Sequence, residues 1–229
     1  PYLVREMEAA ANPDHESGMR EFDRALVGHM GYFAGNLMRA FIYSISGSHL
    51  AGSPVKGRVA QYYRRLAQMS AAFAAVSDLA LMVMGGGLKR KEKISGRFAD
   101  ALGYMFYTSA ILKKFEDDGR PRADLPLVEY SAKFCLYQVQ IALDEILRNF
   151  PGKIVGLVTR LLVFPLGLSL RQPNDNLSHR AAAILMKPGD VRDRLSKGMY
   201  LADDPDDITG KLEDALHKVI AADPIEKRL

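Results

Sequence analysis

An apolar seam that recurs every three or four residues from Val59 to Val83 is the feature that most limits what this chain can fold into. This spacing places the side chains on one face of an α-helix and does not fit the alternation of a strand. Ser53-Pro54 predicts the start of the helix, because serine can cap unpaired amides and proline is tolerated in the first turn. Gly85-Gly86-Gly87 predicts its end. We therefore expect a helix from Pro54 to Met84, about 45 Å long.

The same periodicity predicts further helices, and no strand pattern competes with it. They are expected at about 20–46, 98–117, 125–150, 154–164, 175–186, 190–197 and 207–221. The helix at 98–117 is apolar over most of its circumference and is expected to lie centrally. The predicted fold is all-α, an up-down helical bundle over 54–165 followed by short C-terminal helices. We expect three regions: 1–52 as a domain tail and linker, 53–165 as the bundle, and 166–229 as the short-helix segment.

Charge and cysteine content narrow the classes of partner and compartment. The chain carries 31 basic and 27 acidic residues, a net charge of +4, and residues 89–122 account for the excess. Residues 202–214 are strongly acidic, so the charge is bipolar and no nucleic-acid partner is expected. The single Cys135 excludes an internal disulfide framework and indicates a reducing, cytoplasmic compartment.

Two apolar windows raise the question of a membrane. Met69 to Leu88 has Asp78 as its only charged residue, and a central aspartate costs about 2.5–3.5 kcal/mol on insertion scales, so we interpret this window as bundle core. Ile154 to Leu170 follows Lys153 and is interrupted by Arg160. We expect a buried fourth bundle helix there, with contact to a bilayer surface as the alternative.

Few residues form patterns that carry chemistry. The glycines at 85–87 precede Lys89 to Lys93, which would suit an anion, but they follow a helix rather than a strand, so a turn is expected. Cys135 lies in an apolar helix and is expected to be a buried hydrophobe. Asp78 and Asp100 are expected to form buried structural ion pairs. The histidines at 15, 29, 49, 179 and 217 have no metal-ligand spacing, so no metal site is expected.

Short segments along nearly the whole chain resemble the C-terminal part of one enzyme family. The family is the bacterial long-chain acyl-CoA dehydrogenases of fatty-acid β-oxidation, the large kind with an extra C-terminal extension. The segments, specific in their order and spacing, are Pro1-Tyr2 with Glu6–Ala10, Gly86–Arg90, Asp124–Val128, Asn149–Pro151, Phe164-Pro165, Gly198–Leu201 and Ala221–Ile225.

This resemblance implies a flavoprotein parent in which a glutamate base removes the α-proton of an acyl-CoA and FAD accepts the β-hydride. Related enzymes carry that glutamate in a Tyr-Glu-Gly type motif, which this sequence lacks. No catalytic residue is therefore assigned, and FAD is expected in the parent enzyme but not in this fragment. The helix pattern resembles a second copy of the family's four-helix domain. Arg148–Gly152 stands where the catalytic copy has its glycine-rich flavin turn.

We expect the chain to be a piece of a longer polypeptide that packs on the catalytic domains of the same parent. We also expect a homodimer. A peripheral contact with the inner membrane is expected through Ile154 to Leu170. Two alternatives remain open. One is a free-standing helical interaction module, and the other is an enzyme with its own acyl-CoA or flavin site, for which Lys89 to Lys93 would face the phosphates.

Overall fold

A computed structural model describes residues 2–200, 204 and 206–226 of the chain. Over these residues the fold is all-α, with nine α-helices, two short 3₁₀ helices and no strand, which confirms the predicted fold class. The chain divides into two compact units, one of residues 1–121 and 128–173 and the other of residues 122–127 and 174–229. Pro1, Leu201, Asp203 and Pro205, which belong to segments considered above, lie outside the described residues.

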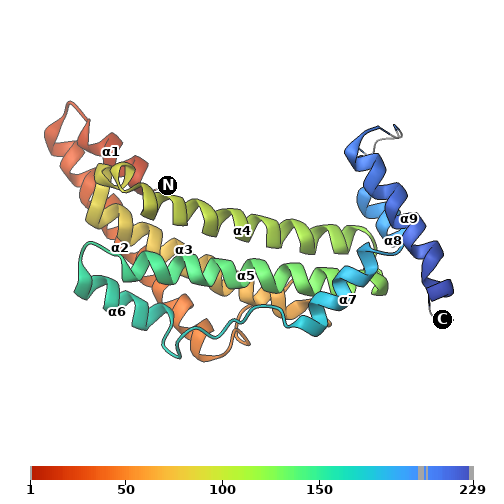
Figure 1. Ribbon diagram of the computed structural model, residues 1–229. Helices are drawn as coiled ribbons and strands as arrows, with labels where there is room; N and C mark the ends of the chain where they lie inside the picture. Colours follow the sequence, from red (N-terminus) through yellow and green to blue (C-terminus); the bar gives the residue numbers. More distant parts are fainter. Residues whose placement is uncertain (1, 201–203, 205, 227–229) are drawn as a thin grey trace. The chain divides into compact units, whose positions relative to one another are not determined.

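The first unit is an up-down arrangement of long helices (Figure 1). Its helices are α1 (Tyr2–Ala10), α2 (His15–Ile45), α3 (Ala60–Met84), α4 (Glu92–Asp117), α6 (Lys153–Val163) and α5 (Leu125–Arg148), whose first turn is assigned to the second unit. Aromatic pairs tie neighbouring helices together. The rings of Phe73 and Phe98 join α3 to α4 edge-on at 5.8 Å, and those of Tyr104 and Phe134 join α4 to α5 at 6.2 Å.

The predicted start of α3 is wrong by about one and a half turns, since the helix begins at Ala60 rather than Pro54. The Ser53 hydroxyl donates to the carbonyl of Val55 and accepts from its amide, which forms a local turn instead of a helix cap. Gly57 then takes a positive φ of 95°, which ends that turn before the helix begins. The predicted end is confirmed, because α3 stops at Met84 and the glycines that follow begin a 3₁₀ helix, Gly85–Arg90.

Helix α3 lies in the core of the first unit. Its buried side chains are mainly alanines together with Met69 and Val76, so neighbouring helices approach its backbone closely. By length and composition alone the segment Ala60–Arg90 could cross a membrane. Since its small-residue face is buried among α2, α4 and their neighbours, we interpret it as a core helix.

The expectation that the helix at 98–117 lies centrally is wrong. Helix α4 buries one face, which includes Ala101, Met105 and Leu112, while Leu102 and Phe106 on the other face are more than half exposed. An all-round apolar helix indicates burial only when every face has a partner within the same unit. The outer face of α4 has none among the described residues of this unit.

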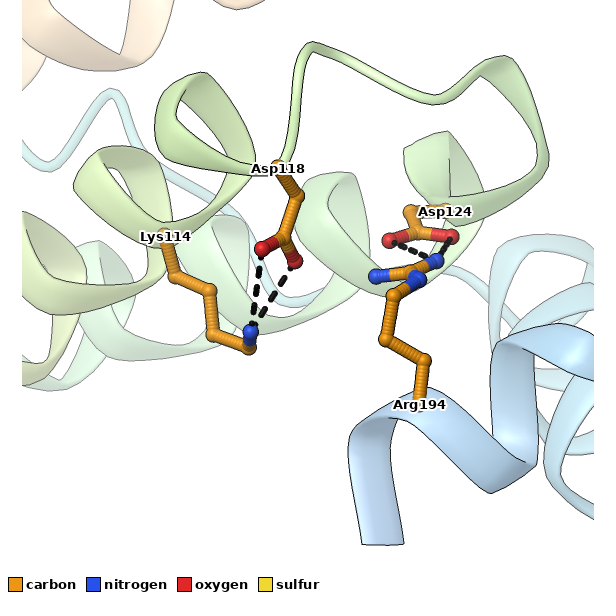
Figure 2. Close-up of polar contacts among 4 residues, drawn as sticks. All are labelled: Lys114, Asp118, Asp124 and Arg194. Carbon is orange, nitrogen blue, oxygen red and sulfur yellow. Dashed lines mark hydrogen bonds and ion pairs between the residues drawn. The ribbon is translucent and has the colours of Figure 1, made fainter. Parts of the chain in front are cut away.

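The second unit holds η2 (Arg122–Asp124), α7 (Asp175–Leu185), α8 (Asp190–Ser196) and α9 (Ile208–Glu226). Asp124 is buried, and its carboxylate accepts hydrogen bonds of 2.7 and 2.9 Å from Nη2 of Arg194 in α8 (Figure 2). A second pair joins Arg192 to Glu213 of α9 at 2.5 Å.

In the first unit, Figure 2 also shows the ion pair of Lys114 with Asp118 one turn later, at 2.9 Å.

Candidate functional site

Helix α6 presents an apolar face to solvent. It buries only Gly156, Thr159 and Val163, while Ile154 and Leu157 are 78% and 56% exposed. The other exposed apolar side chains of this surface are Val155, Val158, Leu161 and, just beyond the helix, Leu166. We call these six residues the α6 face. The prediction of a fully buried fourth helix is therefore wrong, because among the described residues of the first unit α6 has neighbours on one side only.

Close backbone packing fixes α6 in this orientation. A Cβ atom on Gly156 would lie 2.5 Å from the carbonyl oxygen of Leu147 and 2.7 Å from Cβ of Phe150. Only glycine permits this approach, so the sequence places its one buried glycine of α6 where the helix touches the end of α5. At the other end of α6, the Ser44 hydroxyl of α2 donates to the carbonyl oxygen of Val163 at 2.7 Å.

Arg160, in the last turn of α6, turns away from the exposed face of the helix. Nε of Arg160 donates to Oδ1 of Asp144 at 2.5 Å, and Nε of Arg148 lies 2.6 Å from the other carboxylate oxygen. Asp144 is buried in α5, so Arg160 is paired inside the unit with a carboxylate that it shares with the more exposed Arg148. What remains at the surface is aliphatic, with the exposed Lys153 at its edge. A surface of this kind suits an apolar or interfacial environment.

Helix α2 carries a second exposed apolar surface. Met19, Val27, Met30, Met38 and Ile45 are all exposed and fall within an arc of about 100° at the angular step of an α-helix. We call these five residues the α2 stripe. The stripe is interrupted by the exposed Asp23, and its apolar side chains make it a candidate interaction surface.

The most buried cluster of titratable groups surrounds His29 of α2. Its Nδ1 lies 2.8 Å from Oε1 of Glu6, its Nε2 lies 3.7 Å from Oδ1 of Asp78, and the ring of Tyr2 stacks on it. Burial raises the pKa of Asp78, and the neighbouring His29 opposes the rise. Tyr2 covers the imidazole and also contacts Gly28, so this cluster fastens α1 onto α2. The expected structural role of Asp78 agrees with this geometry.

The remaining sequence candidates do not converge on one site. Asp100 is exposed, so its expected buried ion pair is wrong. The basic residues from Lys89 to Lys93 are also exposed, on the 3₁₀ turn and the start of α4. Cys135 is buried, and burial raises the pKa of its thiol, which agrees with a packing role. Among the described residues no group of histidine, cysteine, aspartate and glutamate could hold a metal ion.

The turn at 148–152 stands where a catalytic copy of the domain would have its flavin-contacting turn. It is closely packed. Phe150 is 3% exposed beneath it, and the side chain of Asn149 donates to the carbonyl oxygen of Glu145 at 2.7 Å. The backbone of Gly156 fills the space beside Phe150. The residues at 148–152 therefore do not fit a flavin ring, and no step through FAD is derived for this chain.

The ion pair between Arg160 and Asp144 was not predicted from the sequence, although part of the pattern is visible there. Asp144 and Arg148 have the i, i+4 spacing of a helical ion pair, but Arg160 is brought in by the turn between α5 and α6.

Comparison with known proteins gives one match that covers the chain. The family model described as Acyl-CoA dehydrogenase, C-terminal, bacterial type, matches residues 1–229. No solved structure matches the chain.

Proposed function

Because the chain belongs to the family of bacterial-type acyl-CoA dehydrogenase C-terminal domains, which confirms the resemblance found in the sequence, we propose that it attaches its parent enzyme to a membrane surface. The family implies FAD in the parent enzyme, which would dehydrogenate fatty acyl-CoA in β-oxidation. In this proposal the chain carries neither the catalytic base nor the flavin, and its contribution is structural. The packed turn at 148–152 supports that division of labour.

The observation that carries the proposal is the α6 face. Its six aliphatic residues are exposed together on one short helix and the turn after it. Amphipathic helices of this kind lie in the plane of a bilayer interface with the apolar face inserted. Arg160 is paired with Asp144, so insertion would not bury its guanidinium without a counterion. Lys153 stands at the edge of the face, where a cation can approach anionic headgroups.

Flotation of the protein with vesicles of phosphatidylcholine and phosphatidylglycerol tests the proposal. We expect the protein to float with vesicles at low salt and to be retained in part at high salt, because apolar insertion is not screened. Protein that stays at the bottom of the gradient under both conditions would rule out the membrane role.

A second candidate role rests on the α2 stripe. We propose that this stripe packs on the catalytic domains of the same parent chain, or on a second copy within a homodimer. A photo-crosslinker at Val27 in the parent enzyme should link to the catalytic domains or to a second subunit, and the same group at Gln61, which is exposed on α3, serves as the comparison. A crosslinker at Val27 that captures only solvent would contradict this role.

A further inference from the structure

A cavity of about 260 Å³ opens between the start of α3, the middle of α5 and the segment 165–173, which we call the strap. Gln61, Tyr62 and Arg65 line it from α3, Lys133 and Leu136 from α5, and residues 169–172 from the strap. We propose that this cavity binds a phosphate group, carried by a lipid headgroup or by a soluble phosphate compound. The proposal is independent of the α6 face and of the membrane role argued from it.

The charged residues that line the cavity are all basic. Three of its lining side chains are cations, Arg65, Lys133 and Arg171, and no carboxylate lines it among the described residues. None of the three forms an ion pair with a carboxylate in the described part of the chain. On α5, the carboxylate closest in sequence to Lys133 is Glu129. It is paired with Arg58 at 2.7 Å. The cavity therefore has an uncompensated positive charge, which an anion would neutralise.

The Arg65 side chain is oriented by a hydrogen bond within the protein. It is half-buried, and burial lowers the pKa of its guanidinium. Its Nη1 donates to the neutral Oε1 of Gln68 at 3.3 Å, so the orienting partner does not remove the charge. A partly desolvated guanidinium without a counterion binds a phosphate more strongly than a solvated one, since part of the desolvation cost has already been met in folding.

A buried polar network fixes Gln68 and, through it, Arg65. The Nε2 group of Gln68 donates to the Ser44 hydroxyl at 2.8 Å, and the Ser48 hydroxyl donates to its Oε1. Ser48 is 1% exposed and adopts a positive φ of 68°, a conformation that is unusual for serine. Strain of this kind persists where the surroundings over-determine it. The arginine side of the cavity is thus preorganised.

The opposite wall is fixed by a buried glutamine. Gln140 of α5 pairs with the backbone of Leu170, accepting from its amide at 2.9 Å and donating to its carbonyl oxygen at 3.0 Å. This double hydrogen bond holds the strap, which runs beside α5 in Figure 1, and so fixes the position of the residues that line the cavity. Two anchored walls lower the ordering cost of binding.

The donors and the size of the cavity favour phosphate over a larger organic ligand. Burial and the nearby Glu129 raise the pKa of Tyr62 to about 12, so its phenol keeps its proton and can donate. The cavity is smaller than the roughly 300–1,000 Å³ of sites for drug-sized molecules. Leu136 supplies an apolar wall, which leaves room for the organic group that a phosphate ester carries.

The test uses two probes, inorganic phosphate and vesicles that contain phosphatidic acid in phosphatidylcholine, and two variants. Arg65→Gln removes the held guanidinium. Arg64→Gln removes the same charge from the neighbouring residue, which does not line the cavity, and serves as the matched control. Circular dichroism and thermal melting without phosphate show whether each variant is folded. Phosphate affinity is measured by calorimetry and vesicle affinity by flotation.

We expect Arg65→Gln to weaken binding at least tenfold with one of the probes, while Arg64→Gln changes it less than twofold. A loss seen with inorganic phosphate supports the site and indicates a soluble ligand. A loss seen only with vesicles supports the site and indicates a lipid headgroup. Equal losses in the two variants would overturn the proposal, because they would show a general effect of net charge, and so would the absence of binding to both probes.

Discussion

Replacing Ile154 and Leu157 together by glutamine should detach the protein from vesicles while leaving its fold intact. These side chains are 78% and 56% exposed, so they contribute little to the core of the first unit. Both lie on the α6 face, where a bilayer interface would cover them. The variant therefore separates the membrane role from stability.

The size of the effect follows from the exposed fractions. Full burial of an isoleucine or leucine side chain is worth about 1.5–3 kcal/mol, and only the part exposed in the protein can be newly buried on binding. Taking about 2 kcal/mol for each residue and scaling by its exposure gives about 2.7 kcal/mol for the pair. This corresponds to a loss of about 90-fold in the partition coefficient.

The assay is flotation over a series of lipid concentrations, with far-UV circular dichroism and thermal melting to confirm the fold. The matched control is the double variant Leu102→Gln with Phe106→Gln on α4, whose side chains are 56% and 68% exposed. We expect the control to bind vesicles as the wild type does. A change of less than threefold in the α6 variant would refute the reasoning, and so would an equal loss in the α4 variant, which would show that any exposed apolar side chain drives binding.

Two further predictions concern stability. Gly156→Ala should lower the free energy of unfolding by about 1–3 kcal/mol, because its Cβ would lie 2.5 Å from the Leu147 carbonyl oxygen. The control Gly31→Ala, with open space around it, should raise the free energy of unfolding by up to about 1 kcal/mol. Urea denaturation measures both, and equal effects would contradict the packing of α6. The folded-state pKa of Asp78 is raised above its ordinary value of 3.8, so the native state binds more protons than the unfolded state between those two pKa values, and stability should fall as pH rises through that window. Asp78→Asn should abolish that fall in denaturation curves measured across acidic pH, with His29 still in place; an unchanged pH dependence would assign it to another group.

Much of the fold could be predicted because its signals are local. The end of α3 follows from three consecutive glycines, and the seam of α5 through Leu136, Val139 and Leu143 is buried as its spacing predicts. The start of α3 could not be placed as well, because a serine and a proline fit a turn as readily as a helix cap. What decided between them was the positive φ of Gly57, which no propensity scale contains.

The exposed faces could not be predicted, since apolarity does not say which partner covers a side chain. Phe106 on α4 and Leu157 on α6 both belong to apolar helices, and the sequence favours burial for each. The structure leaves both at the surface of the first unit. In the role proposed above, the α6 face meets a membrane, and its chemistry is the reason for choosing that partner. A purely aliphatic face with its arginine withdrawn suits lipid.

Arg64 and Arg65 show why the phosphate cavity in particular lies beyond sequence reasoning. The two residues are identical and adjacent, and periodicity treats them as two positions on a polar helix face. Only the fold makes them different, because Arg65 alone lies within reach of Gln68 and lines the cavity. That difference depends on Ser44 and Ser48, which are brought in from the end of α2 and the turn after it. A charge that the fold holds in place and leaves unpaired is costly unless something binds it. The paired variants Arg65→Gln and Arg64→Gln test whether the held guanidinium has such a ligand. If the unpaired guanidinium has no ligand, Arg65→Gln should bind phosphate and vesicles no less than Arg64→Gln does.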